Sequence, residues 1–226
     1  MITSNKKARN NIFFDFDGVI ADSLTLTIKI TNKLLALYKK PTRLTLQIFR
    51  ENYKTGGLLP MYTQLFGFKP EEVAEVLETR KKIMGNKFIF PSLYAGIPAL
   101  LRRLSKKYNL FILSSAKSAN INKILKKYKL DACFVKIYGQ EDLDKWHKPD
   151  PQYFLIPAHQ QKLNKNHIVM IGDSVDDIVG AHRAGFAAIA CSWGWQKHQE
   201  LIKVNPEAVA NTPKELEQHI NSVLKP

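Results

Sequence analysis

The chain has 226 residues and a formal net charge of +14, from 34 lysines and arginines against 20 acidic residues. This length suffices for one sizeable core with an insertion. The apolar runs of the chain are too short to span a membrane, and its polar first ten residues lack the apolar core of a signal peptide. We therefore expect a cytoplasmic protein with no membrane contact, whose two separated cysteines, Cys133 and Cys191, are reduced and bind no metal.

The first predicted element is a buried parallel strand over Ile12–Phe14, which leads directly into Asp15-Phe16-Asp17-Gly18. Strand alternation places the side chains of Asp15 and Asp17 on the same face. Two carboxylates this close repel each other unless a cation or a shared proton relieves them. The pair therefore indicates a metal site, a shifted carboxyl pKa, or both, with a solvated polar strand end as the alternative.

A helical insertion is predicted next, because the interval before the following strand-end motif is about ninety residues, far longer than an ordinary connection. Its apolar residues recur at helical spacing. The pattern predicts four helices: 24–38, ending before Pro41; a second around 44–49; 58–66, closed by Gly67; and a fourth opened by Pro70 and running to Ile83.

The loop between the second and third of these helices is a candidate substrate contact. Its paired glycines, Gly56 and Gly57, let a backbone approach a ligand closely. Arg50 and Lys54 lie beside them and could receive an anionic group. An ordinary interhelical turn with solvated charges is an equal alternative.

Strands and helices alternate through the rest of the chain, which favours a parallel sheet in three layers. The predicted elements are a helix over 97–108, strand 110–113, helix 119–128, a strand near 133–137, helix 153–162, strand 168–171, a helix from Asp177 to Gly185, strands 187–190 and 207–210, and a helix that starts at 212–213. In such sheets the ligand site forms outside the carboxyl ends of the strands.

Four polar groups fall at that edge: Asp15, Ser114 after the second long strand, Lys148 in a Lys-Pro-Asp-Pro turn, and Asp173 with Asp177 after strand 168–171. Each has a structural explanation when taken alone. Ser114 could cap a helix, Lys148 could be a surface lysine, and Asp177 could be a favourable charge in a helical first turn. Their shared location favours a functional site.

In this order the four motifs resemble those of the haloacid dehalogenase-like hydrolases, and Phe14 to Ser23 is close to the first motif of the phosphoglycolate phosphatase-like branch. The resemblance covers nearly the whole chain. It implies a Rossmann-like three-layer parallel sheet core made of residues 1–22 and 91–226, with a small inserted helical cap over 23–90 that closes over the site.

The resemblance also implies roles for the motif residues. Asp15 corresponds to the nucleophile that forms an aspartyl-phosphate, and Asp17 to the general acid and base. Ser114 and Lys148 correspond to the groups that bind phosphoryl oxygens.

A Mg²⁺ ion is implied as cofactor, since it suits an all-oxygen site. In the family the ion is held by the first aspartate, the backbone carbonyl of the second, and a fourth-motif aspartate. These positions correspond to Asp15, Asp17 and Asp173, with Asp177 a ligand through water or a support for the others.

The function implied is hydrolysis of a small phosphorylated metabolite, such as phosphoglycolate or a sugar phosphate, by a monomer or homodimer. A phosphosugar mutase of the same superfamily is the alternative that retains both first-motif acids. A non-catalytic basic module for nucleic acid or protein would be expected to lose a motif acid, and none is lost. The basic residues are spread along the chain in pairs instead of forming one tract with interleaved aromatics, which favours solvated helix faces over a nucleic-acid partner.

Overall fold

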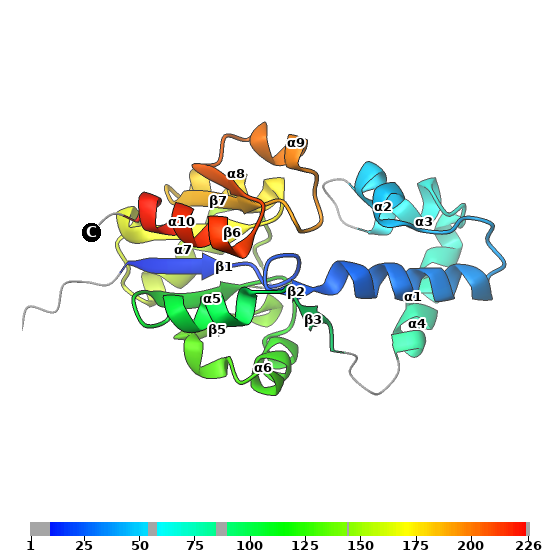
Figure 1. The fold of residues 1–226 in the computed structure, drawn as a ribbon. Helices are drawn as coiled ribbons and strands as arrows, with labels where there is room; N and C mark the ends of the chain where they lie inside the picture. Colours follow the sequence, from blue (N-terminus) through cyan, green and yellow to red (C-terminus); the bar gives the residue numbers. More distant parts are fainter. Residues whose placement is uncertain (1–9, 54–57, 85–89, 144, 225–226) are drawn as a thin grey trace, which may run out of the picture.

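The computed structural model describes residues 10–53, 58–84, 90–143 and 145–224. Its centre is a six-stranded sheet with the order β5-β4-β1-β6-β7-β8, in which every pairing is parallel (Figure 1). The predicted parallel sheet is therefore confirmed. The strands are β1 (Asn11–Phe14), β4 (Asn109–Leu113), β5 (Lys136–Tyr138), β6 (Ile168–Gly172), β7 (Ala187–Cys191) and β8 (Ala208–Ala210).

Two apolar clusters, one on each face of the sheet, make the core three-layered. The strands alternate as expected: Ile12 and Phe14 of β1 join one cluster, and Phe13 joins the other. The first face is covered by α5 (Ile97–Leu104), α6 (Ser118–Lys127) and α10 (Pro213–Val223), and the second by α7 (Pro151–Gln160), α8 (Val175–Arg183) and α9 (His198–Ile202).

The predicted insertion is helical and has an apolar cluster of its own. It contains α1 (Ser23–Leu37), α2 (Leu46–Asn52), α3 (Leu59–Gln64), the short 3₁₀ helix η1 (Pro70–Glu72) and α4 (Val73–Met84). The cluster is built around buried Leu34, Phe49, Tyr62 and Val76. We refer to α1 to α4 as the inserted helices.

A two-stranded antiparallel ribbon lies between the sheet and the inserted helices (Figure 1). It pairs β2 (Ala21–Asp22) with β3 (Ser92–Leu93). The backbone N–H of Tyr94 extends the contact by donating to the carbonyl of Ile20 at 3.1 Å. The chain therefore leaves the core and returns to it at the same place.

The observed elements differ from the predicted ones mainly at their ends. The helix expected over 97–108 ends at Leu104, and the helix expected over 58–66 covers only 59–64. The strand expected near 133–137 covers 136–138, because a 3₁₀ helix, η2 (Asp131–Cys133), occupies the residues before it. Helix α7 begins two residues before the expected start, where the Asp150 side chain accepts from the N–H of Gln152 at 2.8 Å.

Two further short 3₁₀ helices, η3 (Gln140–Asp142) and η4 (Lys165–His167), complete the described elements. Both cysteines are free thiols, Cys191 buried and Cys133 half-buried. Among the residues that the structure describes, no helix combines the length and the apolar character needed to cross a membrane.

Candidate active site

The order of the strands brings three predicted site residues into one row. Strand β1 lies between β4 and β6. Asp15 follows β1, Ser114 follows β4 and Asp173 follows β6, so all three emerge at the carboxyl edge of adjacent strands. The N–H of Asp15 continues the sheet by donating to the carbonyl of Ile171 at 2.9 Å. The row is thus fixed by backbone hydrogen bonds.

Three carboxylates gather at this edge. Asp15, Asp173 and Asp177 each offer an oxygen, and these oxygens lie within 4.8 Å of one another. Asp173 is 3% exposed and Asp177 is fully buried. Three acids this close in a buried place create strong mutual repulsion, which a cation or a proton must relieve.

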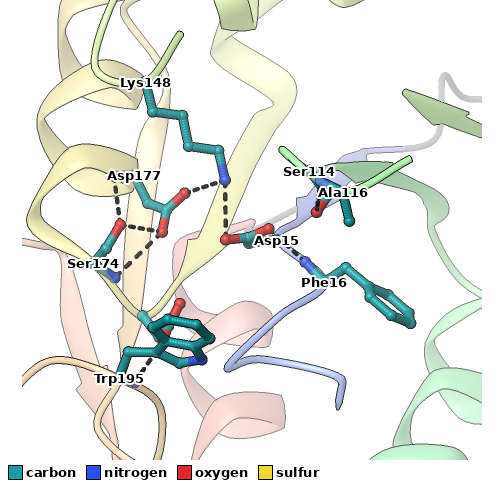
Figure 2. A network of polar contacts seen from close by, with 9 residues as sticks. Asp15, Phe16, Ser114, Ala116, Lys148, Ser174, Asp177 and Trp195 are labelled. Carbon is teal, nitrogen blue, oxygen red and sulfur yellow. Dashed lines mark hydrogen bonds and ion pairs between the residues drawn. The ribbon is translucent and has the colours of Figure 1, made fainter. Parts of the chain in front are cut away.

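Lys148 supplies one positive charge to the cluster. Its Nζ lies 3.0 Å from Asp15 Oδ2 and 2.6 Å from Asp177 Oδ1, and Figure 2 shows it between the two acids. Burial opposes the charge on the lysine, but Asp15 and Asp177 outweigh that effect and hold the pKa of Lys148 well above its usual range. The lysine is therefore a fixed cation in the site.

One lysine does not neutralise the first-motif acids. Burial, together with the charges of Asp177 and Asp17, raises the pKa of Asp15 to about 7, although Lys148 opposes the shift. Burial also raises the pKa of Asp17, opposed by the nearby Ser23 hydroxyl and by Lys148. In the absence of a further cation, both acids hold protons more strongly than a free aspartate does.

Asp177 is oriented by the start of its own helix. Its Oδ2 accepts from the hydroxyl of Ser174 at 2.6 Å and from the N–H of Ser174 at 3.2 Å, and the Ser174 oxygen caps the N–H of Asp177 in return. The Asp177 side chain packs directly against the backbone of Gly172, because a Cβ at this glycine would lie 2.2 Å from the Cβ of Asp177. With Oδ1 on Lys148, both carboxylate oxygens of Asp177 already have partners.

Asp173 is enclosed by backbone. Its Oδ2 accepts from the N–H of Trp195 at 2.7 Å. A Cβ on Gly18, whose φ is +81°, would lie 2.0 Å from that oxygen, and a Cβ on Gly194 would lie 2.2 Å from it. Burial and the charges of Asp15 and Asp177 raise the pKa of Asp173 well above its usual range.

The donor set fits a hard divalent cation. It consists of carboxylate oxygens from half-buried Asp15 and buried Asp173 and Asp177, and Mg²⁺ and Ca²⁺ prefer such oxygens. Burial and the neighbouring acids raise the pKa values of Asp15 and Asp173, and such an ion would favour their ionised forms. Asp17 lies in the tight loop that leaves β1, where it bridges to Ala21.

Ser114 is 1% exposed, and its Oγ accepts from the N–H of Ala116 at 3.2 Å. Figure 2 shows this side chain beside Asp15. It does not cap α6, which starts four residues later with Lys117 at the capping position. The serine therefore belongs to the loop at the carboxyl edge of the sheet.

Of the four candidate substrate residues of the insertion, the structure describes one. Lys54, Gly56 and Gly57 lie outside the described residues. Arg50 is described, and its Nη2 donates to the carbonyl of Trp193, at 3.0 Å, and to that of Gly194. Its guanidinium thus contacts a core loop.

That loop was not singled out from the sequence. Trp193 to Gln196 follow β7, so they too leave the carboxyl edge of the sheet. A glycine between two tryptophans directly after a predicted strand was the available signal. Tyr53, at the C-terminal end of α2, was also missed. Its ring contacts that of Trp195, and burial, with the charges of nearby acids, raises its pKa.

The family model described as haloacid dehalogenase-like hydrolase matches residues 12–191. That range includes every motif residue of the site and all the inserted helices.

Several known proteins are similar to this chain over nearly its full length. The chain is 27% identical to a 5′-nucleotidase of Pseudomonas aeruginosa, covering 87% of this chain and 88% of that protein. It is 24% identical to a phosphoglycolate phosphatase of Synechococcus elongatus, covering 95% and 98%. A solved haloacid dehalogenase-like family hydrolase from Streptococcus pneumoniae superimposes with a TM-score of 0.78 at 21% identity, covering 94% of this chain and 98% of the other.

Proposed function

The chain belongs to the haloacid dehalogenase-like hydrolase family, in its phosphoglycolate phosphatase-like branch, and from this premise we propose that it is a Mg²⁺-dependent phosphatase of a small phosphorylated metabolite. The observation that carries the proposal is the placement of Lys148 between Asp15 and Asp177, beside Asp173. Residues 1–22 and 91–226 form the catalytic core in this proposal, and residues 23–90 form the cap.

Asp15 is the nucleophile. One of its carboxylate oxygens attacks phosphorus, the bond from phosphorus to the leaving oxygen breaks, and an aspartyl-phosphate forms. Lys148, 3.0 Å from Oδ2, favours the ionised form that this step needs. The N–H of Phe16 donates to Oδ1 at 2.6 Å and helps to fix the direction of the carboxylate.

Asp17 is the general acid and base. Its raised pKa suits a carboxyl that arrives protonated and gives its proton to the leaving oxygen. The resulting carboxylate then takes a proton from water, whose oxygen attacks phosphorus and releases Asp15. The proton taken from water returns Asp17 to its starting protonated form.

Lys148 and Ser114 bind the phosphoryl oxygens. Ser114 is 1% exposed and the Lys148 side chain 9% exposed, so a hydroxyl and a charge act here with little screening by water. Lys148 therefore has two tasks, since it also orients Asp15.

The Mg²⁺ ion would be held by Asp15, by the backbone carbonyl of Asp17 and by Asp173. When bound, it supplies positive charge that neutralises the nucleophile and the phosphoryl group. Asp177, whose two oxygens are engaged by Ser174 and Lys148, acts through water or as a support.

Substrate choice belongs to the cap, because the core residues contact only the phosphoryl group. Phosphoglycolate or a sugar phosphate remains the proposed substrate class, with Arg50, Lys54, Gly56 and Gly57 as proposed contacts. A panel of phosphorylated metabolites with Mg²⁺, including nucleoside monophosphates and β-glucose 1-phosphate, tests the class. Isomerisation of the sugar phosphate without release of phosphate would favour the mutase alternative.

The direct test of the reaction is Asp15→Asn. This change removes the nucleophile but keeps the size of the side chain, so turnover of an aryl phosphate should fall by several orders of magnitude while the circular dichroism spectrum stays the same. Hydrolysis at the wild-type rate by the folded variant would refute the mechanism.

We also propose a cytoplasmic enzyme, which the free thiols of Cys133 and Cys191 support. Cell fractionation tests the location. A monomer or a homodimer stays a prediction that light scattering on the purified protein would decide.

A further inference from the structure

One peptide group joins the inserted helices to the acidic cluster. It consists of the carbonyl of Gly194 and the N–H of Trp195. The carbonyl accepts from Arg50 of α2, and the N–H donates to Asp173 Oδ2 at 2.7 Å. Because a peptide group is planar and rigid, a rotation that moves its oxygen must also move its N–H.

The charges at the two ends of this peptide group match its dipole. A guanidinium faces the oxygen, and a carboxylate faces the N–H. Hydrogen bonds to charged groups are stronger than neutral ones, and bonds in a chain polarise one another. The hydrogen bond from Arg50 and the hydrogen bond to Asp173 therefore strengthen each other through the peptide group that they share.

Arg50 also fixes the peptide group before this one, because its Nη2 donates to the carbonyl of Trp193 at 3.0 Å. The indole of Trp193 is held by the core: its Nε1 donates to the carbonyl of Val19 at 3.2 Å, and its ring packs beside the first apolar cluster. This end of the loop is thus tied to the segment that carries Asp15 and Asp17.

The indole of Trp195 packs on the opposite side, against the cluster of the inserted helices. Its ring meets Phe49 at 5.5 Å and Tyr53 at 5.2 Å between centroids, both edge to face, and these two rings stack on each other at 5.0 Å. The two tryptophans thus contact different parts of the molecule, and the glycine between them provides the carbonyl of the peptide group described above.

The loop is anchored beyond Trp195 as well. Gln196 is 5% exposed, and its Oε1 accepts from the N–H of Val175 in the first turn of α8 at 2.6 Å. The loop from Trp193 to Gln196 is therefore bonded to the segment after β1, through Val19, and to the segment after β6, through Asp173 and Val175. Arg50 of the inserted helices donates to its backbone.

We propose that Arg50 is a positioning residue that acts through the Gly194–Trp195 peptide group to orient Asp173 for the metal. The inference rests on the proposed function in its metal role. In this inference Arg50 binds the backbone of the Trp193–Gln196 loop, whereas in the substrate role proposed above it binds the leaving group of the substrate. The two roles predict different effects of replacing Arg50.

Amide hydrogen exchange tests the proposal without metal, substrate or activity. In the wild type, the Trp195 amide is expected to be protected by its bond to Asp173. Arg50→Ala should speed its exchange at least tenfold, while Arg43→Ala, which removes an exposed arginine of the same insertion, should leave it unchanged. Arg50→Lys keeps the charge but loses the fork geometry, so an intermediate rate is expected.

The second readout is the affinity for Mg²⁺ without substrate, measured by calorimetry. Loss of a group that orients a ligand costs about 10- to 100-fold in metal affinity. We expect a loss in this range for Arg50→Ala and none for Arg43→Ala. If Arg50→Ala kept the wild-type metal affinity and raised the Michaelis constant only for substrates with an anionic leaving group, the result would support the substrate role and overturn the proposal.

Unchanged exchange at Trp195 in folded Arg50→Ala would also overturn it, and Arg50→Lys serves as the test if the alanine variant does not fold. These outcomes are separate from the fate of the proposed function. A wild type that hydrolyses no phosphate ester would refute the function, while the exchange data would still decide the role of Arg50.

Discussion

Lys148 Nζ lies nearer to Asp177 than to Asp15, at 2.6 Å against 3.0 Å. The lysine thus makes its closer contact with Asp177, whose carboxylate is oriented by Ser174. This contact fixes the position of the ammonium group that lies beside the proposed nucleophile, Asp15. Since Asp177 lies in the first turn of α8 and Lys148 precedes α7, the ion pair also joins two elements that cover the same face of the sheet.

Replacement of this lysine should therefore affect both catalysis and stability. Lys148→Met leaves Asp15 and Asp177 without their ion-pair partner, and breaking a buried pair costs about 3 kcal/mol. We expect that loss in urea unfolding at pH 8 in the presence of EDTA, and turnover reduced by several orders of magnitude. Lys203→Met, at an exposed position, serves as the control and should change neither. Equal stability of the two variants would mean that the pair does not stabilise the fold.

Asp173→Ala should weaken the metal site. The variant loses one of the clustered carboxylates, so we expect a higher requirement for Mg²⁺ and activity that high Mg²⁺ restores in part. The measurement is initial rate against Mg²⁺ concentration. The matched control is Asp176→Ala, which removes a neighbouring acid outside the cluster and should leave the requirement nearly unchanged. An unaltered requirement in Asp173→Ala would count against its role as a ligand.

Two helix caps of the same kind separate stability from catalysis. Ser174 caps α8 by accepting from the N–H of Asp177, and Thr212 caps α10 by accepting from that of Glu215, both at 3.2 Å. Replacing either with alanine should cost about 1 kcal/mol in unfolding free energy. Only Ser174→Ala also removes the hydroxyl bond to Oδ2 of Asp177 and leaves this oxygen with the backbone N–H of residue 174, so only this variant should lose turnover. Similar rates in the two variants would show that the orientation of Asp177 does not matter for the reaction.

The metal-free protein should become less stable as the pH rises. The pKa of Asp15 is about 7 in the folded chain, above the usual 3.8. Between these values the folded chain holds a proton that the unfolded chain has released, so the free energy of unfolding falls as the pH rises toward 7 and levels off above it. Thermal melts in EDTA from pH 5 to 8 measure this fall.

Asp15→Asn is the control for that experiment, because the variant lacks the titrating group and should show a smaller fall. Added Mg²⁺ should raise the melting temperature of the wild type more at pH 8 than at pH 5, since the ion binds the deprotonated acids. A wild type and a variant with the same slope would show that Asp15 titrates normally.

The sheet and the meeting of the motif residues could be predicted because they depend on local patterns. The apolar runs at 12–14, 110–113 and 168–171 are buried strands, and each ends in a polar residue at the same edge. Parallel strands place such residues at one edge of the sheet, and the observed order β4-β1-β6 brings Asp15, Ser114 and Asp173 together.

Features that depend on long-range contacts could not be predicted. Strands β2 and β3 have two residues each, and only their mutual pairing makes them strands. The contacts of Arg50 join residues 143 and 144 positions apart, which no local pattern records. Helix ends failed for a related reason: residues 105–108 continue the helical hydrophobic pattern but leave α5 as turns on the way to β4.

The β2–β3 ribbon joins the two ends of the insertion directly, Asp22 opposite Ser92. For the sheet, residues 23–91 therefore amount to a loop that is closed at its base. The entropy needed to close a loop grows only with the logarithm of its length, so the number of residues above the ribbon has little influence on whether the six strands assemble. The same core can carry insertions of very different size, and selection can remodel the inserted helices while the folding of the sheet stays the same.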